Sequence, residues 1–189
     1  MGVLLVVRER EGLLELETRR RVFLAVQRYA GLPLAGLAKE AGLDEDLVRY
    51  HVRVLERAGM ARTEEEGGMR RVYPLEATPY GTVSPLTPEQ RQLLGVLRRP
   101  AVLRAVVALL DRGPLAVGEL ALACGVRPST ASHHLRSMEQ AGLVHVESKG
   151  RERIVQLRDR DGVLRLLADH PPPRDLVQGF VEAWDDLGL

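Results

Sequence analysis

Side chains that hydrogen-bond well to nucleic acid are concentrated in residues 125–143, GVRPSTASHHLRSMEQAGL. If this stretch is helical, its apolar side chains at i, i+4 and i+7 form one buried face. The polar side chains then cover the remaining surface. Hydroxyl, imidazole and guanidinium groups donate to phosphate oxygens and to base edges in a DNA groove. The residues predicted to contact DNA here are Arg127, Ser129, Thr130, Ser132, His133 and Arg136, and those predicted to be buried are Ala131, Leu135 and Met138.

A second cationic group follows in residues 143–157, which are predicted to form a β-hairpin with its tip at Gly150. Lys149, Arg151 and Arg153 surround that tip. Residues 84–168 hold 13 Lys plus Arg against 8 Asp plus Glu, although the whole chain has a net charge of only +1. Because duplex DNA is a polyanion, this local excess favours contact between the hairpin and the DNA backbone.

The elements that position these groups are predicted from apolar periodicity and from the breaks made by Gly and Pro. In the second half, helices are expected over 101–112, 117–124 and around 162–168, beside the polar-faced helix. In the first half, a helix is expected from Thr18 through Tyr29, helices over 34–41 and 44–58, and two strands within 60–74. A hairpin or a strand is expected over 2–17. The apolar contacts of helix 44–58 are predicted to be Leu47, Val48, Tyr50, Val54 and Leu55.

The two halves repeat each other at a constant spacing of 83 residues. Leu37 matches Leu120, Gly42 matches Gly125, and the correspondence continues through His51 and His134, Arg53 and Arg136, Glu56 and Glu139, Gly59 and Gly142, and Gly67 and Gly150. A constant offset across two helices, a turn and a hairpin tip indicates an internal duplication.

On these residues the second half resembles the ArsR-type winged-helix transcription regulators. Its Ser129-Thr130-Ala131-Ser132-His133-His134-Leu135 run, followed by Ala141-Gly142-Leu143-Val144, is similar to the recognition helix and first wing strand of that family. The tandem layout also resembles archaeal-type predicted regulators with two helix-turn-helix domains in one chain. The resemblance implies a homodimer that binds double-stranded DNA.

The predicted fold is mainly α with small β wings, arranged as two tandem winged helix-turn-helix domains. The first domain is expected over 1–75, a Pro-containing linker over 76–88, and the second domain over 89–170. Residues 171–189 begin with three prolines, and the apolar face predicted for the helix that follows either packs on the chain's own core or pairs with a second protomer.

The first copy carries acids where the second carries cations. Asp44, Glu45 and Asp46 stand in place of Arg127, Pro128 and Ser129, and residues 64–66 are all glutamate. Acids in a first helical turn favour the helix dipole, yet they repel phosphate. The sequence therefore leaves open whether the first copy binds DNA, holds a dimer or binds a partner. Its candidate DNA contacts are Arg49, Tyr50, Arg53, Arg70 and Arg71.

Other functions find less support in the sequence. The positions of the Cys-x-Cys metal ligands of ArsR-type sensors are Ala116 and Gly118, so no metal, cofactor or catalytic residue is predicted. The single cysteine, Cys124, is expected to fill the core and suits a cytoplasmic location. No stretch is long enough to span a membrane. The main alternative is a tandem winged-helix scaffold that acts through protein contacts, in chromosome organisation or beside a polymerase.

Overall fold

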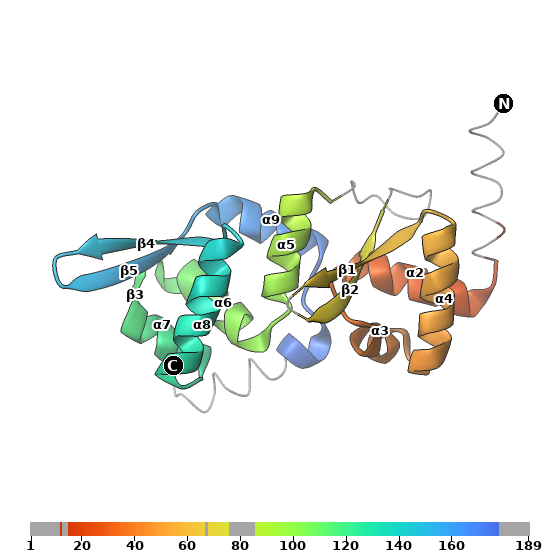
Figure 1. Cartoon of the computed structure of the whole chain (residues 1–189), viewed down its shortest axis with the longest axis horizontal. Helices are drawn as coiled ribbons and strands as arrows, with labels where there is room; N and C mark the ends of the chain where they lie inside the picture. Colours follow the sequence, from red (N-terminus) through yellow and green to blue (C-terminus); the bar gives the residue numbers. More distant parts are fainter. Residues whose placement is uncertain (1–11, 13–14, 67, 76–85, 178–189) are drawn as a thin grey trace. The chain divides into compact units, whose positions relative to one another are not determined.

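The computed structural model describes residues 12, 15–66, 68–75 and 86–177. The chain divides into two units, Met1–Thr87 and Pro88–Leu189 (Figure 1). Most of the predicted N-terminal hairpin, the predicted linker and the last predicted helix lie outside the described residues. Gly12, where that hairpin was predicted to turn, is helical. Among the residues described, no helix combines the length and apolar character needed to cross a bilayer.

The first unit packs three helices against a two-stranded hairpin. Its elements are α2 (Glu17–Arg28), α3 (Leu34–Ala41), α4 (Glu45–Arg57), β1 (Ala61–Glu66) and β2 (Met69–Pro74). The strands pair antiparallel with Ala61 opposite Pro74. Val22, Phe23 and Val26 of α2 are fully buried against α3 and α4, which gives α2 the helical apolar face that the sequence predicted.

The second unit has the same order with a helix added at each end. Its elements are α5 (Pro88–Leu97), α6 (Pro100–Arg112), β3 (Leu115–Ala116), α7 (Val117–Cys124), α8 (Pro128–Gln140), β4 (Val144–Lys149), β5 (Glu152–Leu157) and α9 (Arg160–Asp169). The sheet order is β3-β5-β4, all antiparallel. The hairpin of β4 and β5 extends away from the helices as a wing (Figure 1). Both units are therefore winged helix-turn-helix folds.

The offset of 83 residues extends to the bounds of the elements. α3 corresponds to α7, α4 to α8, β1 to β4 and β2 to β5 without any shift. It also reaches single hydrogen bonds, because Arg21 donates to the carbonyl of Ala41 as Arg104 donates to that of Cys124. The short strand β3 was not predicted, since two residues show no periodicity. Its counterpart in the first unit is a single bridge between Leu32 and Val72.

The predicted inner face of α4 was wrong at two positions. Val48 and Leu55 are fully buried, but Leu47 and Tyr50 are 39% and 55% exposed. The buried polar residue on this helix is instead His51. A helix has room for one apolar stripe, and positions 48, 52 and 55 form it.

Candidate nucleic-acid interface

The helix α8 presents its polar side chains outward because its apolar residues face the core. Ala131, Leu135 and Met138 are buried, as predicted. Gly142, at φ +72°, follows the C-terminal end of the helix and turns the chain into β4. The side chains predicted to contact DNA are all exposed, namely Arg127, Ser129, Thr130, Ser132, His133 and Arg136.

Two arginines of the second unit fix α8 and the turn before it. Arg104 on α6 donates from Nε and Nη2 to the carbonyl oxygen of Cys124, at 2.9 and 2.7 Å. This bond holds the end of α7, where Gly125 adopts φ +63° and starts the turn. Arg99 donates from Nη1 to Ser137 Oγ on α8 at 2.8 Å. The orientation of α8 relative to α6 is thus set by charge-assisted hydrogen bonds as well as by apolar packing.

The adjacent histidines of α8 lie in different environments. Their ring centroids are 6.0 Å apart, and only His133 is exposed. Burial, with the nearby His133, Arg99 and Arg104, lowers the pKa of His134. Cys124 is buried as predicted, and burial raises the pKa of its thiol while Arg104 opposes that shift. His133 is the member of the pair that can meet a ligand in solvent.

The wing displays its cations at the tip. Lys149 lies opposite Glu152 and Ser148 opposite Arg153 in the β4–β5 register. Lys149, Arg151 and Arg153 are exposed, so the predicted cationic group is at the surface.

Sequence analysis missed a polar cluster nearer the base of this wing. His145 Nε2 lies 3.2 Å from Glu147 Oε1, and Gln156 contacts both side chains. The alternation of polar residues along paired strands was the signal that could have found it, since 145, 147 and 156 share one face of the hairpin. These contacts hold the side chains at the base of the wing.

In the first unit the equivalent surface is acidic and partly neutralised within itself. Asp44 accepts a hydrogen bond from the backbone N–H of Asp46 at 2.8 Å and so caps α4. Arg49 is ion-paired with Glu45, at 2.9 Å, and with Asp46. Its guanidinium is therefore engaged by two carboxylates of its own helix.

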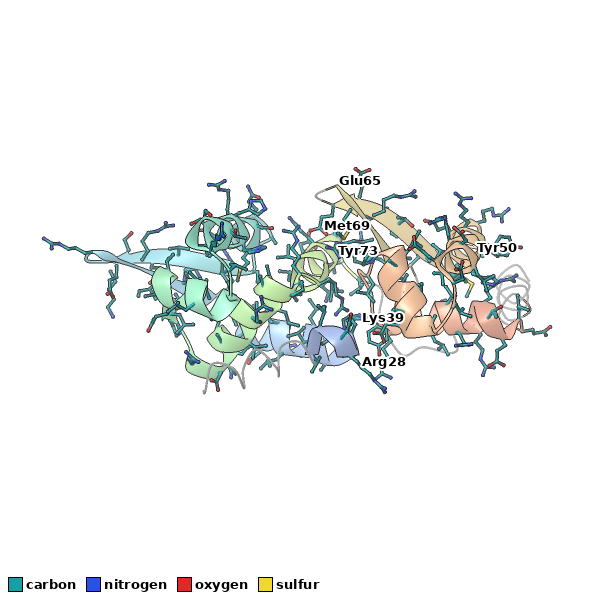
Figure 2. The ribbon with its side chains drawn as sticks, turned by 90° about the horizontal axis from the view of Figure 1, so that it is seen from below. Arg28, Lys39, Tyr50, Glu65, Met69 and Tyr73 are labelled. Carbon is teal, nitrogen blue, oxygen red and sulfur yellow. The ribbon has the colours of Figure 1, made fainter. Side chains whose placement is uncertain are left out.

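One predicted DNA contact of the first unit is wrong. The side chain of Arg71 is only 3% exposed, and it donates to the carbonyl of Gly31 at 2.8 Å and pairs with Glu66 at 3.6 Å. The other candidates there, Tyr50, Arg53 and Arg70, are exposed. Figure 2 shows Tyr50 on α4, with Glu65 and Met69 at the hairpin.

The acidic residues around α9 are too far apart for one metal site. Asp159 caps the start of the helix by accepting from the N–H of Gly162 at 2.8 Å, whereas Asp169 ends it. A helix of this length is roughly 15 Å long. Across the described ranges, no three His, Cys, Asp or Glu side chains are grouped as metal ligands.

Two families of helix-turn-helix sequences match the chain. The family described as "Bacterial regulatory protein, arsR family" matches residues 99–146, from the start of α6 into β4. The family described as "Helix-turn-helix domain" matches residues 13–64, which include α2, α3 and α4. The chain therefore contains two helix-turn-helix domains, and the second is of the arsR type.

Similar proteins carry regulator names. The chain is 33% identical over 106 residues to the uncharacterized HTH-type transcriptional regulator YdfF of Bacillus subtilis (strain 168), covering 55% of this chain and 46% of that protein. It is 42% identical over 66 residues to the HTH-type transcriptional regulator Rv2034 of Mycobacterium tuberculosis (strain ATCC 25618 / H37Rv), covering 35% of this chain and 61% of that protein. The chain thus spans about half of these relatives' length. The transcriptional repressor BigR of Xylella fastidiosa aligns over 41% of this chain and 78% of its own, with 26% identity and a TM-score of 0.36.

Proposed function

Because the chain contains two helix-turn-helix domains and the second is of the arsR type, we propose that it regulates transcription by binding duplex DNA, mainly through α8. The observation that carries this proposal is the outer face of α8. It holds no carboxylate before Glu139, and its hydroxyl, imidazole and guanidinium groups are exposed. A face of this composition suits the major groove, where such groups bond to base edges and phosphates.

The N-terminal end of α8 and the wing contact the DNA backbone in this proposal. Arg127 precedes the first turn, whose free N–H groups and dipole favour phosphate. Lys149, Arg151 and Arg153 lie at the exposed tip of the hairpin, where they meet phosphates beside the groove. The side chains of Ser132, His133 and Arg136 then contact bases.

The protein acts as a homodimer in this proposal. One base-contacting helix per chain covers a short half-site, and a two-fold partner places a second helix one DNA turn away. The segment after Pro173, of which Arg174–Val177 is helical, is proposed to pack on its own unit or against the second protomer. A cytoplasmic location goes with the proposal.

A salt titration of duplex binding tests the function. Fragments selected from random duplex DNA supply the probe. The logarithm of the association constant should fall linearly with the logarithm of salt concentration. Arg136→Ala should weaken binding by about 1–3 kcal/mol with a base preference lost, while Lys149→Ala should weaken it uniformly and reduce the salt slope by about 1. Arg165→Ala, an exposed arginine on α9, is the matched control. Absence of duplex binding at low salt would overturn the proposal.

The second candidate is a tandem winged-helix scaffold that acts through protein contacts. It is favoured by the first unit, where Arg49 is engaged by carboxylates and Arg71 is buried. The same titration separates the two functions, because a scaffold needs no affinity for duplex DNA.

A further inference from the structure

We propose that the outer face of α4 binds the α7–α8 surface of a second copy of this chain, so that the first unit of each copy covers the α8 of the other. The resulting dimer competes with DNA. The inference rests on the proposed function only in naming what the covered helix otherwise binds, and the self-association itself is measured without DNA.

An exposed apolar pair forms the centre of the α4 face. Leu47 and Tyr50 are three residues apart, so they are neighbours on the helix surface. They are 39% and 55% exposed. At the matching positions of α8 the chain has the polar residues Thr130 and His133. The first unit therefore presents apolar area on the helix face where the second presents hydrogen-bonding groups.

Acidic residues border this apolar pair. Asp44, Glu45 and Asp46 precede it in the first turn of α4, and Arg49 neutralises one of their three charges. All three acids are exposed. The face is thus complementary to a surface that has an apolar centre and a basic edge.

The second unit offers such a surface. Leu122 on α7 is 77% exposed, and α7 packs against α8. Arg127 follows it five residues later and is also exposed, and the first turn of α8 contains no acid. At the position matching Leu122 the first unit has Lys39, so the apolar and charged positions are exchanged between the two copies of the fold.

Charge decides which pairing forms between two chains. Two α4 faces would bring like charges together, which disfavours an α4–α4 contact. The contact between α4 of one copy and α7–α8 of the other joins opposite charges. It occurs twice about a two-fold axis and closes the assembly as a dimer. DNA must displace the acidic face to reach α8, so the dimer lowers the affinity for DNA until it opens.

Sedimentation velocity on three full-length samples tests the contact. Tyr50→Ala and Leu122→Ser should each weaken self-association at low salt by about tenfold or more, as loss of a central interface residue does. An equimolar mixture of the two variants should regain dimer, because Tyr50 of one chain still meets Leu122 of the other. A symmetric α4–α4 or α7–α7 contact would give no such recovery.

Charge and apolar controls complete the experiment. Glu45→Gln with Asp46→Asn should weaken the dimer and raise duplex affinity, and high salt should reduce the difference from the unsubstituted chain, since screening falls to about 3 Å at 1 M salt. Leu24→Ala removes a similarly exposed apolar side chain from α2 and should change nothing. A dimer unaffected by Tyr50→Ala, a mixture without recovery, or a monomer at low salt would each overturn the inference. If duplex binding fails but the mixture recovers dimer, the proposed function is wrong and the contact is real.

Discussion

At the scale of single residues, matching histidines occupy positions 51 and 134 of the two helices α4 and α8. His51 is 2% exposed, and within the described part of the chain neither of its ring nitrogens has a hydrogen-bond partner. Burial and the nearby Arg19 lower the pKa of His51, and burial is the first cause for His134 as well. Both side chains are therefore neutral in the folded protein at pH values where the unfolded chain already binds protons.

These two histidines predict acid destabilisation with a definite sign. The pKa of an unfolded-chain histidine is about 6.5, and the folded values are lower, so the unfolded chain takes up protons first. The free energy of unfolding should be constant above pH 6.5 and fall as the pH drops below it. Urea denaturation from pH 7.5 to 5 measures this. His51→Leu should flatten the curve of the first unit, whereas the exposed His133→Ala should not. An unchanged slope in His51→Leu would contradict the argument.

Residue types predicted the surface of α8 better than that of the first unit. The period of 3.6 residues was enough to place Arg136 outside and Met138 inside. Arg71 could not be placed in this way, because the carbonyl of Gly31 that binds it comes from forty residues earlier. Leu47 and Tyr50 were predicted as apolar contacts because composition alone does not show which apolar residues a helix leaves exposed.

At the scale of elements, two glycines flanking α7 predict opposite responses to alanine. Gly125 has φ +63°, and a Cβ there would also meet Arg104 at 3.5 Å, so Gly125→Ala should cost about 1–2 kcal/mol. Gly118 lies within α7 with nothing within 4 Å of its Cβ position, so Gly118→Ala should stabilise by about 0.5–1 kcal/mol. Chemical denaturation of both variants checks the signs. Equal effects would show that backbone conformation does not set the turn.

The bounds of most elements follow from local signals. Pro100 and Gly113 delimit α6, and Gly125 and Gly142 follow α7 and α8. These residues act locally, so sequence alone predicts them. The strand β3 depends on a partner forty residues away, Val155 for Leu115, and escaped prediction for that reason.

At the scale of the whole molecule, a duplicated fold has kept its core and changed its surface. Leu37 and Leu120 are both buried, as are Leu55 and Met138. The exposed first turns of α4 and α8 differ in charge. Packing constrains the buried positions, whereas surface substitutions away from special contacts change stability little. The repeat was visible in sequence because its offset is constant, and the acidic first turn was visible because charge needs no fold to be counted.

The charge of the first unit sets how many phosphates the whole protein neutralises. Replacing the first turn of α4 by its counterpart, with Asp44→Arg, Glu45→Pro and Asp46→Ser, removes three acids and frees Arg49 from two ion pairs. If the acids keep the first unit off DNA, this variant should bind duplex DNA more tightly, with a salt slope steeper by about 0.9 for each phosphate gained. Glu17→Arg changes charge at the start of α2, away from this turn, and is the control. An equal steepening in the control would mean that net charge, not the surface of α4, governs the affinity.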